Sequence, residues 1–332
     1  MFEFGSFLFQ NLRKFVHYLK KMLQVQQVSF SYSDAITVSD IHFSLEKGQT
    51  LALIGESGCG KSTLLKLIYG LYDLNEGRIF WNEQEVLGPK FHLIPGMSYM
   101  KYLAQDFDLM PYITVAENVG KYLSNFYPEK KQARIAELLE VVEMTEWVDV
   151  KAKNLSGGQM QRVAIARVLA LEPEVLLLDE PFSHIDNFRK NSLRRKLFRY
   201  LKEKEITTLI ATHDSTDVLS FADAVLVLQQ GKIIESGSPE TIYSHPKSKY
   251  VASLFGDVNE IVVDGKVELI YPNQLQVVPE SELKVVVTES YFRGSHYLIE
   301  GSRNDETFYF EHITAIPEGT FVFLQKISPE TI

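Results

Sequence analysis

The chain has 332 residues, a length that fits one large domain and a smaller one. Its formal net charge is −9, and most of the acidic excess falls in residues 256–332, so the basic surface of a nucleic-acid-binding protein is not indicated. The single cysteine, Cys59, excludes an intramolecular disulfide, and no run approaches the roughly 18 apolar residues of a membrane-spanning helix.

Residues 1–21 carry apolar side chains at helical spacing, with lysines and an arginine off that stripe. Two interpretations stay open for this segment. It is either an amphipathic helix that lies on a membrane surface, or an extension upstream of a true translation start at Met22, where the regular pattern begins.

Strand patterns come first after residue 22. The stretch from Leu23 to Ser44 is strand-like, and the run Thr50–Ile54 is apolar throughout, as in a strand that is buried on both faces. A glycine-rich loop follows, and then an apolar helical stretch at Thr63–Tyr69. Strand, glycine loop and helix in this order form the context that a phosphate-binding loop requires.

Helices and strands alternate further along the chain. Residues from about 106 to 171 are mostly helical in pattern, and apolar strands follow, so 22–255 is predicted to form an α/β domain with a helical subdomain. Beyond residue 256, short strand-like runs between turns predict a small all-β module, barrel-like in form. The expected central parallel strands cover 175–179, 207–212 and 224–228.

The glycine-rich loop has the full spacing of a phosphate-binding loop, from Gly55 to Ser62. Its glycines let backbone N–H groups converge on phosphate oxygens, and the dipole of the following helix adds to the attraction. Lys61 is expected to reach the β- and γ-phosphates of ATP, and Ser62 to ligate Mg²⁺. The predicted nucleotide-binding residues here are Gly55, Ser57, Gly58, Cys59, Gly60, Lys61, Ser62 and Thr63.

Two adjacent carboxylates, Asp179 and Glu180, end the apolar run that begins at Val175. At the end of a central strand, one carboxylate can hold the coordination shell of Mg²⁺, and its neighbour can polarise the attacking water. Because a phosphate-binding loop lies upstream, this pair is predicted to be the second half of the same site.

A second phosphate cradle is predicted at Leu155-Ser-Gly-Gly-Gln159. Ser156 has the position of a helix N-cap, and two glycines expose backbone N–H groups where the helix begins. Two cradles in one chain suggest that one of them is completed by a second copy of the protein.

These motifs resemble the nucleotide-binding subunit of an ABC transporter, from about Met22 to Asn259. The resemblance implies a P-loop NTPase fold, binding of ATP with Mg²⁺, and ATP hydrolysis. It implies a homodimer in which each ATP lies between the phosphate loop of one subunit and the signature of the other. It also implies transmembrane permease subunits, an external solute-binding protein, and a place on the cytoplasmic face of the membrane. The signature residues are Ser156, Gly157, Gly158 and Gln159.

The resemblance assigns further roles by position. Gln105 matches the glutamine that senses Mg²⁺ and the permease, and Tyr32 matches the aromatic residue that stacks on adenine. Glu180 matches the general base, His213 the switch histidine at the γ-phosphate, and Asp186 the loop that crosses the dimer. The implied catalytic set is Lys61, Glu180 and His213, and the implied Mg²⁺ ligands are Ser62, Gln105 and Asp179.

Two features resemble the importer branch of this family. Residues 235–256 are similar to the end of the ATPase domain in bacterial solute importers, and 256–332 resemble the small OB-like module called TOBE. That module is found in importers of ferric iron, polyamines, sulfate, molybdate or sugars, and ferric iron or polyamine is the favoured cargo here. Roles for His184 and for residues 88–102 stay open.

Three other functions fit parts of the sequence. A soluble ABC ATPase of translation or DNA repair usually has two cassettes or long coiled-coil insertions, and neither is found here. The ATPase of an exporter would leave the importer-like residues 235–332 unexplained. A regulatory role for the acidic β module, with a metal or anion bound near His296 and His312, rests on two isolated histidines.

Overall fold

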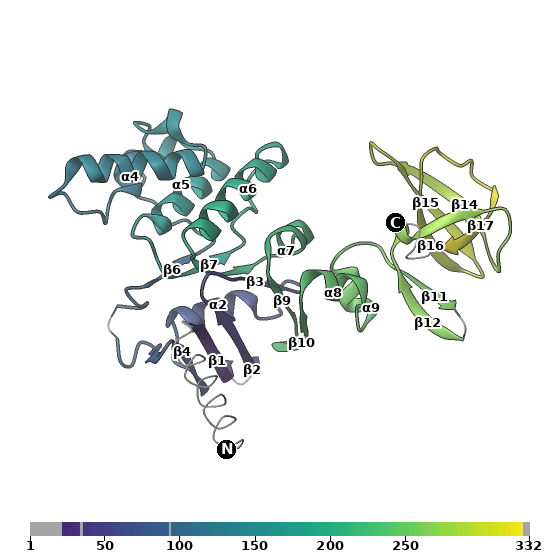
Figure 1. Ribbon diagram of the computed structural model, residues 1–332, viewed down its shortest axis with the longest axis horizontal. Helices are drawn as coiled ribbons and strands as arrows, with labels where there is room; N and C mark the ends of the chain where they lie inside the picture. Colours follow the sequence, from purple (N-terminus) through teal and green to yellow (C-terminus); the bar gives the residue numbers. More distant parts are fainter. Residues whose placement is uncertain (1–21, 34–35, 93, 264, 328–332) are drawn as a thin grey trace, which may run out of the picture. The chain divides into compact units, whose positions relative to one another are not determined.

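The computed structural model describes residues 22–33, 36–92, 94–263 and 265–327 (Figure 1). Both interpretations of residues 1–21 concern a segment outside the described residues. By its contacts the chain divides into two compact units, and the division falls between Pro239 and Glu240. The first unit therefore ends earlier along the chain than the domain boundary expected near residue 256.

A six-stranded sheet is the centre of the first unit, with the strand order β10-β9-β3-β8-β7-β6. All neighbours in this sheet are parallel except β9 and β10. The three central strands β3, β8 and β7 are buried along their whole length, which explains their unbroken apolar runs. The strands are β3 (Thr50–Ile54), β6 (Met100–Leu103), β7 (Val175–Asp179), β8 (Thr207–Ala211), β9 (Ala224–Gln229) and β10 (Lys232–Gly237).

A second, antiparallel sheet of the same unit has the order β2-β1-β4-β5. Its alternating apolar side chains, such as Leu23 and Val25, share one hydrophobic core with helix α2 (Lys61–Tyr69) and with the central strands. This shared core fixes the start of α2 beside the end of β3. The strands are β1 (Met22–Ser31), β2 (Ile36–Glu46), β4 (Glu76–Trp81) and β5 (Gln84–Glu85).

A group of helices follows β6 and precedes β7 in the sequence, and Figure 1 shows α4 beside α5 in this group. Both α3 and α4 pack on α5. Loops take up much of the sequence from 104 to 127, so this part is less helical than its pattern predicts. Helices α6 and α7 follow β7 and β8. The elements are α3 (Val115–Val119), α4 (Pro128–Val141), η1 (Thr145–Trp147), η2 (Ala152–Asn154), α5 (Gly157–Leu169), α6 (Asn187–Glu203) and α7 (Ser215–Phe221).

The second unit contains a β-hairpin and a five-stranded antiparallel sheet of order β13-β17-β14-β15-β16. Two short helices, α8 (Pro239–Ser244) and α9 (Lys249–Ser253), precede the strands. Tyr271 joins them to the β structure, because its ring stacks on Tyr243 at 4.4 Å and its hydroxyl donates to the Ala252 carbonyl. The remaining elements are β11 (Asn259–Val263), β12 (Lys266–Ile270), η3 (Pro272–Gln274), β13 (Leu275–Val278), β14 (Leu283–Phe292), β15 (Tyr297–Arg303), β16 (Glu306–His312) and β17 (Phe321–Lys326).

The predicted fold class is confirmed by this architecture. The first unit is an α/β domain around a mostly parallel sheet, and the strands of the second unit are antiparallel throughout. Among the described residues, no helix is both long enough and apolar enough to cross a membrane.

Candidate nucleotide-binding site

The phosphate loop joins the end of β3 to the start of α2. A side chain at Gly55 would place its Cβ 2.2 Å from the carbonyl oxygen of Leu228, so only glycine fits where the loop passes β9. The ammonium group of Lys61 lies within the loop and donates to the carbonyl oxygens of Gly55 (2.6 Å) and Glu56 (3.0 Å). A buried cation is thus held at the place where the loop would receive phosphate.

Cys59 in the loop and Thr63 in the first turn of α2 make further contacts here. The Cys59 side chain is buried in the hydrophobic core, with its sulfur 3.8 Å from Lys61 Nζ. The hydroxyls of Thr63 and Tyr32 are 3.3 Å apart. Tyr32 is half-exposed, and its ring meets the edges of Phe30 and Tyr72. An exposed aromatic ring therefore stands beside the phosphate loop.

Asp179, at the end of β7, receives two hydroxyl hydrogen bonds. Ser62 in the first turn of α2 donates to Oδ1 at 2.9 Å, and Tyr102 in β6 donates to Oδ2 at 3.1 Å. Burial raises the pKa of the Asp179 carboxyl group, while these two hydrogen bonds oppose the shift. Burial and the nearby Asp179 carboxylate also raise the pKa of Tyr102, so this hydroxyl stays protonated as a donor at neutral pH.

The contact between Ser62 and Asp179 brings together two residues that the sequence placed at one site. The sequence did not predict Tyr102 as a site residue, because no motif contains it. Only the parallel pairing of β6 with β7, in which Tyr102 aligns with Leu177, places its hydroxyl next to that carboxylate.

Glu180 and His213 follow the ends of two adjacent strands, and their side chains are in contact. β7 and β8 are parallel neighbours with Asp179 opposite Ala211, so the residues that follow each strand emerge at the same edge. The Nδ1 atom of His213 lies 2.8 Å from Oε2 of Glu180. Glu180 itself has a left-handed backbone, with φ of 50°, and its N–H donates to the Ala211 carbonyl.

The signature begins helix α5 as predicted. Ser156 is the N-cap, and it exchanges hydrogen bonds with Gln159 in a capping box. One turn on, Gln161 donates to the carbonyl of Glu180 and accepts from the N–H of His184. The start of α5 is therefore anchored to the segment 180–185 that follows the carboxylate pair.

The remaining predicted residues lie at the surface of the first unit. Gln105 is exposed in the turn that follows β6, and Asp186 is exposed as the N-cap residue of α6. His184, whose role was open, has its ring edge-to-face with Phe107 at 5.2 Å and its Nδ1 3.0 Å from the Ser183 hydroxyl. His184 thus connects the segment after Glu180 to the loop that contains Gln105.

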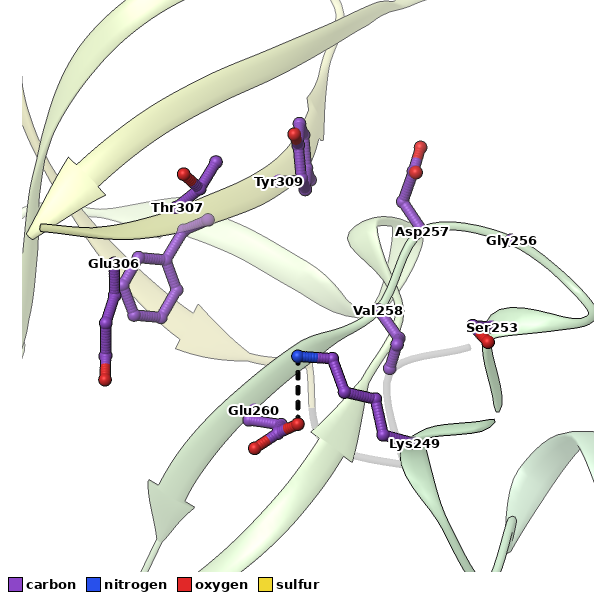
Figure 2. A pocket seen from close by; sticks show the side chains of 10 residues that line it. Lys249, Ser253, Gly256, Asp257, Val258, Glu260, Glu306, Thr307 and Tyr309 are labelled. Carbon is purple, nitrogen blue, oxygen red and sulfur yellow. Dashed lines mark ion pairs between the residues drawn. The ribbon is translucent and has the colours of Figure 1, made fainter. Parts of the chain in front are cut away.

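The second unit has an open pocket of about 710 Å³ between α9, β11 and β16 (Figure 2). Lys249 reaches into it and pairs with Glu260 at 3.0 Å, and the side chains of Asp257 and Glu306 also line it. His296 and His312 are not among its lining residues. No group of three or more metal-ligating side chains is found in the described part of the chain.

Comparisons with known proteins agree with this geometry. The family model described as ABC transporter matches residues 38–183. The chain is 39% identical to a sulfate/thiosulfate import ATP-binding protein of Synechococcus elongatus, over 71% of this chain and 68% of that protein. It is 38% identical to an Fe(3+) ions import ATP-binding protein of Pseudomonas fluorescens, over 71% of this chain and 66% of the relative.

A third relative extends the match further along the chain. The spermidine/putrescine import ATP-binding protein of Pasteurella multocida is 32% identical over 81% of this chain and 76% of its own length. Among solved structures, an ABC transporter subunit of Clostridium perfringens aligns with a TM-score of 0.60 and 29% identity, covering 68% of this chain and 92% of that one. A dimeric ATP-binding cassette with bound ADP and phosphate aligns with a TM-score of 0.58 and 26% identity, covering 65% and 98%.

The sequence predictions of family, fold and ATPase activity are confirmed by these matches. The relatives are importer subunits, which also agrees with the branch that residues 235–332 suggested. The chain belongs to the ABC transporter family, as an ATP-binding and ATP-hydrolysing subunit of the importer type.

Proposed function

We propose that the described site binds ATP with Mg²⁺ through the residues that the motifs identify. The observation that carries the proposal is that the start of α2, the end of β7 and the residues after β8 contact one another at one edge of the central sheet. Ser62 contacts Asp179 at 2.9 Å, and Glu180, the next residue, contacts His213 at 2.8 Å. Oxygen ligands from a hydroxyl and a carboxylate suit Mg²⁺, which takes its other ligands from phosphates and water. Gln105, exposed after β6, is a further ligand in this proposal.

Each residue then has a defined task. Lys61 neutralises the β- and γ-phosphates, and the N–H groups of the phosphate loop orient them. Bound Mg²⁺ would supply charge neutralisation at the phosphate oxygens. Glu180 accepts a proton from the attacking water. His213 contacts the Glu180 carboxylate and holds it in place, and the same histidine approaches the γ-phosphate. Tyr32, beside the loop, stacks on the adenine base.

The functional unit in this proposal is a homodimer. Ser156 and the following turn lie at the N-terminus of α5, where helix N–H groups attract anions. In the dimer this turn covers the γ-phosphate bound to the partner subunit, and Asp186 lies in the loop that crosses the interface. The dimeric form of a structural relative supports this arrangement.

The dimer drives a separate permease in the cell membrane, with the chain on the inner face. ATP closes the dimer because each nucleotide bridges both subunits, and hydrolysis reopens it. The loop with Gln105 transmits closure to the permease. An external solute-binding protein delivers the cargo, for which ferric iron or a polyamine is the choice that two of the relatives support. The second unit serves as the TOBE-like module of the importer.

Two measurements test the proposal. Tagged chain purified from native membranes should recover an integral membrane permease, and its ATPase rate should rise when that permease is present. Recovery of ribosomes or DNA alone would refute the transport role. Uptake of radiolabelled ferric iron and of spermidine, compared between wild-type cells and cells that express only Lys61→Ala protein, then identifies the cargo class.

A further inference from the structure

Tyr102 is a polar contact of the ATPase site that none of the motifs contains. It lies in β6, next to β7 in the central sheet, and its hydroxyl donates to Asp179 Oδ2 at 3.1 Å. The other oxygen of the same carboxylate accepts from Ser62 at 2.9 Å. Each oxygen of Asp179 thus has its own hydroxyl donor, and the two donors come from different elements.

The burial of Asp179 makes this second donor important. The residue is only 3% exposed, so water has little access to its carboxylate. A buried carboxylate oxygen without a hydrogen bond is costly, and the group responds by rotating or by taking up a proton. With Tyr102 in place, Oδ2 is occupied, and the carboxylate plane is fixed with Oδ1 turned to Ser62.

The Tyr102 ring is itself held in position. The ring of Tyr69, from the last turn of α2, packs against it with centroids 5.6 Å apart. Gly96 in turn lies so close to Tyr69 that a Cβ there would be 2.4 Å from its ζ carbon. The segment 88–102, whose role the motifs left open, therefore contributes both Tyr102 and part of the packing that supports it.

We propose that Tyr102 is a positioning residue for Mg²⁺, acting through Asp179. It fixes the carboxylate so that one oxygen faces the Ser62 hydroxyl and the bound metal, and it does not touch the nucleotide. The inference rests on the proposed function, in which Ser62 and Asp179 hold Mg²⁺. It predicts that the Tyr102 hydroxyl contributes to the metal-dependent part of nucleotide affinity and not to the metal-free part.

Tyr102→Phe tests this, with Tyr99→Phe as the matched control. Both changes remove one hydroxyl, and Tyr99 directly precedes the same strand, but its buried hydroxyl has no hydrogen-bond partner among the residues that the structure describes. The affinity of each protein for a fluorescent, non-hydrolysable ATP analogue is measured with Mg²⁺ and again with EDTA. Electron paramagnetic resonance of Mn²⁺ in the analogue complex reports the metal directly, and thermal unfolding confirms that the variants fold.

We expect Tyr102→Phe to weaken analogue binding about tenfold in Mg²⁺, equivalent to about 1.4 kcal/mol, and to leave binding in EDTA unchanged. Its Mn²⁺ spectrum should change, while Tyr99→Phe matches wild type in every measurement. The inference would be overturned if Tyr102→Phe lost analogue affinity equally in Mg²⁺ and in EDTA. It would also be overturned if the ratio of the two affinities in Tyr102→Phe equalled that of wild type. Wild-type protein whose analogue affinity does not depend on metal would instead overturn the proposed Mg²⁺ site, and the inference with it.

Discussion

His213 Nδ1 and Glu180 Oε2 are 2.8 Å apart although the two side chains differ greatly in exposure, at 70% and 15%. The histidine stands at the surface of the subunit, while the carboxylate is mostly enclosed. A second subunit or a nucleotide can therefore contact His213 directly. Glu180 is the group that the attacking water must approach, and the contact joins the two side chains.

Glu180→Gln should abolish turnover without abolishing nucleotide binding. Glutamine keeps the shape and a hydrogen bond to His213 but cannot accept a proton, so we expect ATP hydrolysis to fall about 10²- to 10⁴-fold. Binding of ATP with Mg²⁺ should remain near the wild-type affinity, because Lys61, Ser62 and Asp179 are untouched. Phosphate release and equilibrium nucleotide binding measure the two effects.

Glu205→Gln is the matched control for that experiment. Glu205 is also a glutamate with a left-handed backbone, at φ of 51°, but it lies on the surface, paired with Lys47. Its substitution should leave turnover unchanged. If Glu180→Gln hydrolysed ATP at the wild-type rate, Glu180 would not be the general base.

Gly157 and Gly158 separate a role in dimer closure from a role in folding. A Cβ at Gly158 would lie 2.6 Å from the His184 carbonyl oxygen, whereas the nearest atom to one at Gly157 is His184 Cβ at 4.0 Å. Gly158→Ala should therefore lower stability by about 1–3 kcal/mol, the usual cost of overpacking. Gly157→Ala should fold normally but lose dimerisation with ATP, since its surface faces the partner in the proposed dimer.

Thermal unfolding and size-exclusion chromatography with ATP, both in a Glu180→Gln background, distinguish the two glycine variants. Dimerisation of Gly157→Ala at the level of its parent would remove this residue from the proposed contact. An unchanged melting temperature in Gly158→Ala would show that the segment after Glu180 can shift away from the added methyl group with little loss of stability.

The local structure of both cradles could be predicted from the sequence, whereas their contacts with other segments could not. The phosphate loop is one contiguous motif, so its strand, turn and helix could be read directly, and the same holds for the N-cap at Ser156. Contacts across the sheet could not be read. Asp179 and Tyr102 are far apart in the sequence, and their meeting depends on the placement of β6 beside β7. The link from Gln161 to the segment after Glu180 depends equally on tertiary packing.

The limits of the domains show the same dependence on packing. A change in composition near residue 256 suggested a boundary there. The contacts place it after Pro239, because Tyr271 joins the helices α8 and α9 to the β strands of the second unit. A pattern along the chain does not reveal which neighbour a short helix packs against.

Asp217 should make stability depend on pH. It is 2% exposed, accepts a hydrogen bond from Thr212 at 2.7 Å, and lies beside Arg194 and Asp214. Burial raises the pKa of Asp217 to about 6. Between about pH 4 and pH 6, the folded state therefore keeps a proton on Asp217 that the unfolded chain, in which the pKa is about 4, has released. The contribution of this group is fully present below pH 4 and is lost as the pH rises through 6.

Asp217→Asn removes this titration while its side-chain oxygen can still accept from Thr212. The unfolding free energy of wild type minus that of the variant should fall by about 2 kcal/mol between pH 4 and pH 6. Urea unfolding at several pH values measures the difference. A constant difference across that range would mean that Asp217 stays ionised in the folded protein, held by Arg194.

Asn259 should control the stability of the second unit alone. It is 2% exposed, and its side chain makes three hydrogen bonds that join β11, β12 and β16. The amide donates to the carbonyls of Ile270 (3.1 Å) and Tyr309 (2.8 Å), and its oxygen accepts from the N–H of Tyr309 (2.7 Å). Asn259→Asp keeps the acceptor but turns the donor into an anion that faces two carbonyl oxygens. Each buried group left without a partner costs about 1–3 kcal/mol.

Differential scanning calorimetry of the full chain should show this loss in the transition of the second unit. ATP hydrolysis by the isolated subunit should stay unchanged in Asn259→Asp, because none of the proposed catalytic residues lies beyond Pro239. Asn125→Asp, on an exposed loop of the first unit, is the control and should leave both transitions in place. A fall in ATPase rate together with the second-unit transition would show that the ATPase unit depends on its neighbour for its active form.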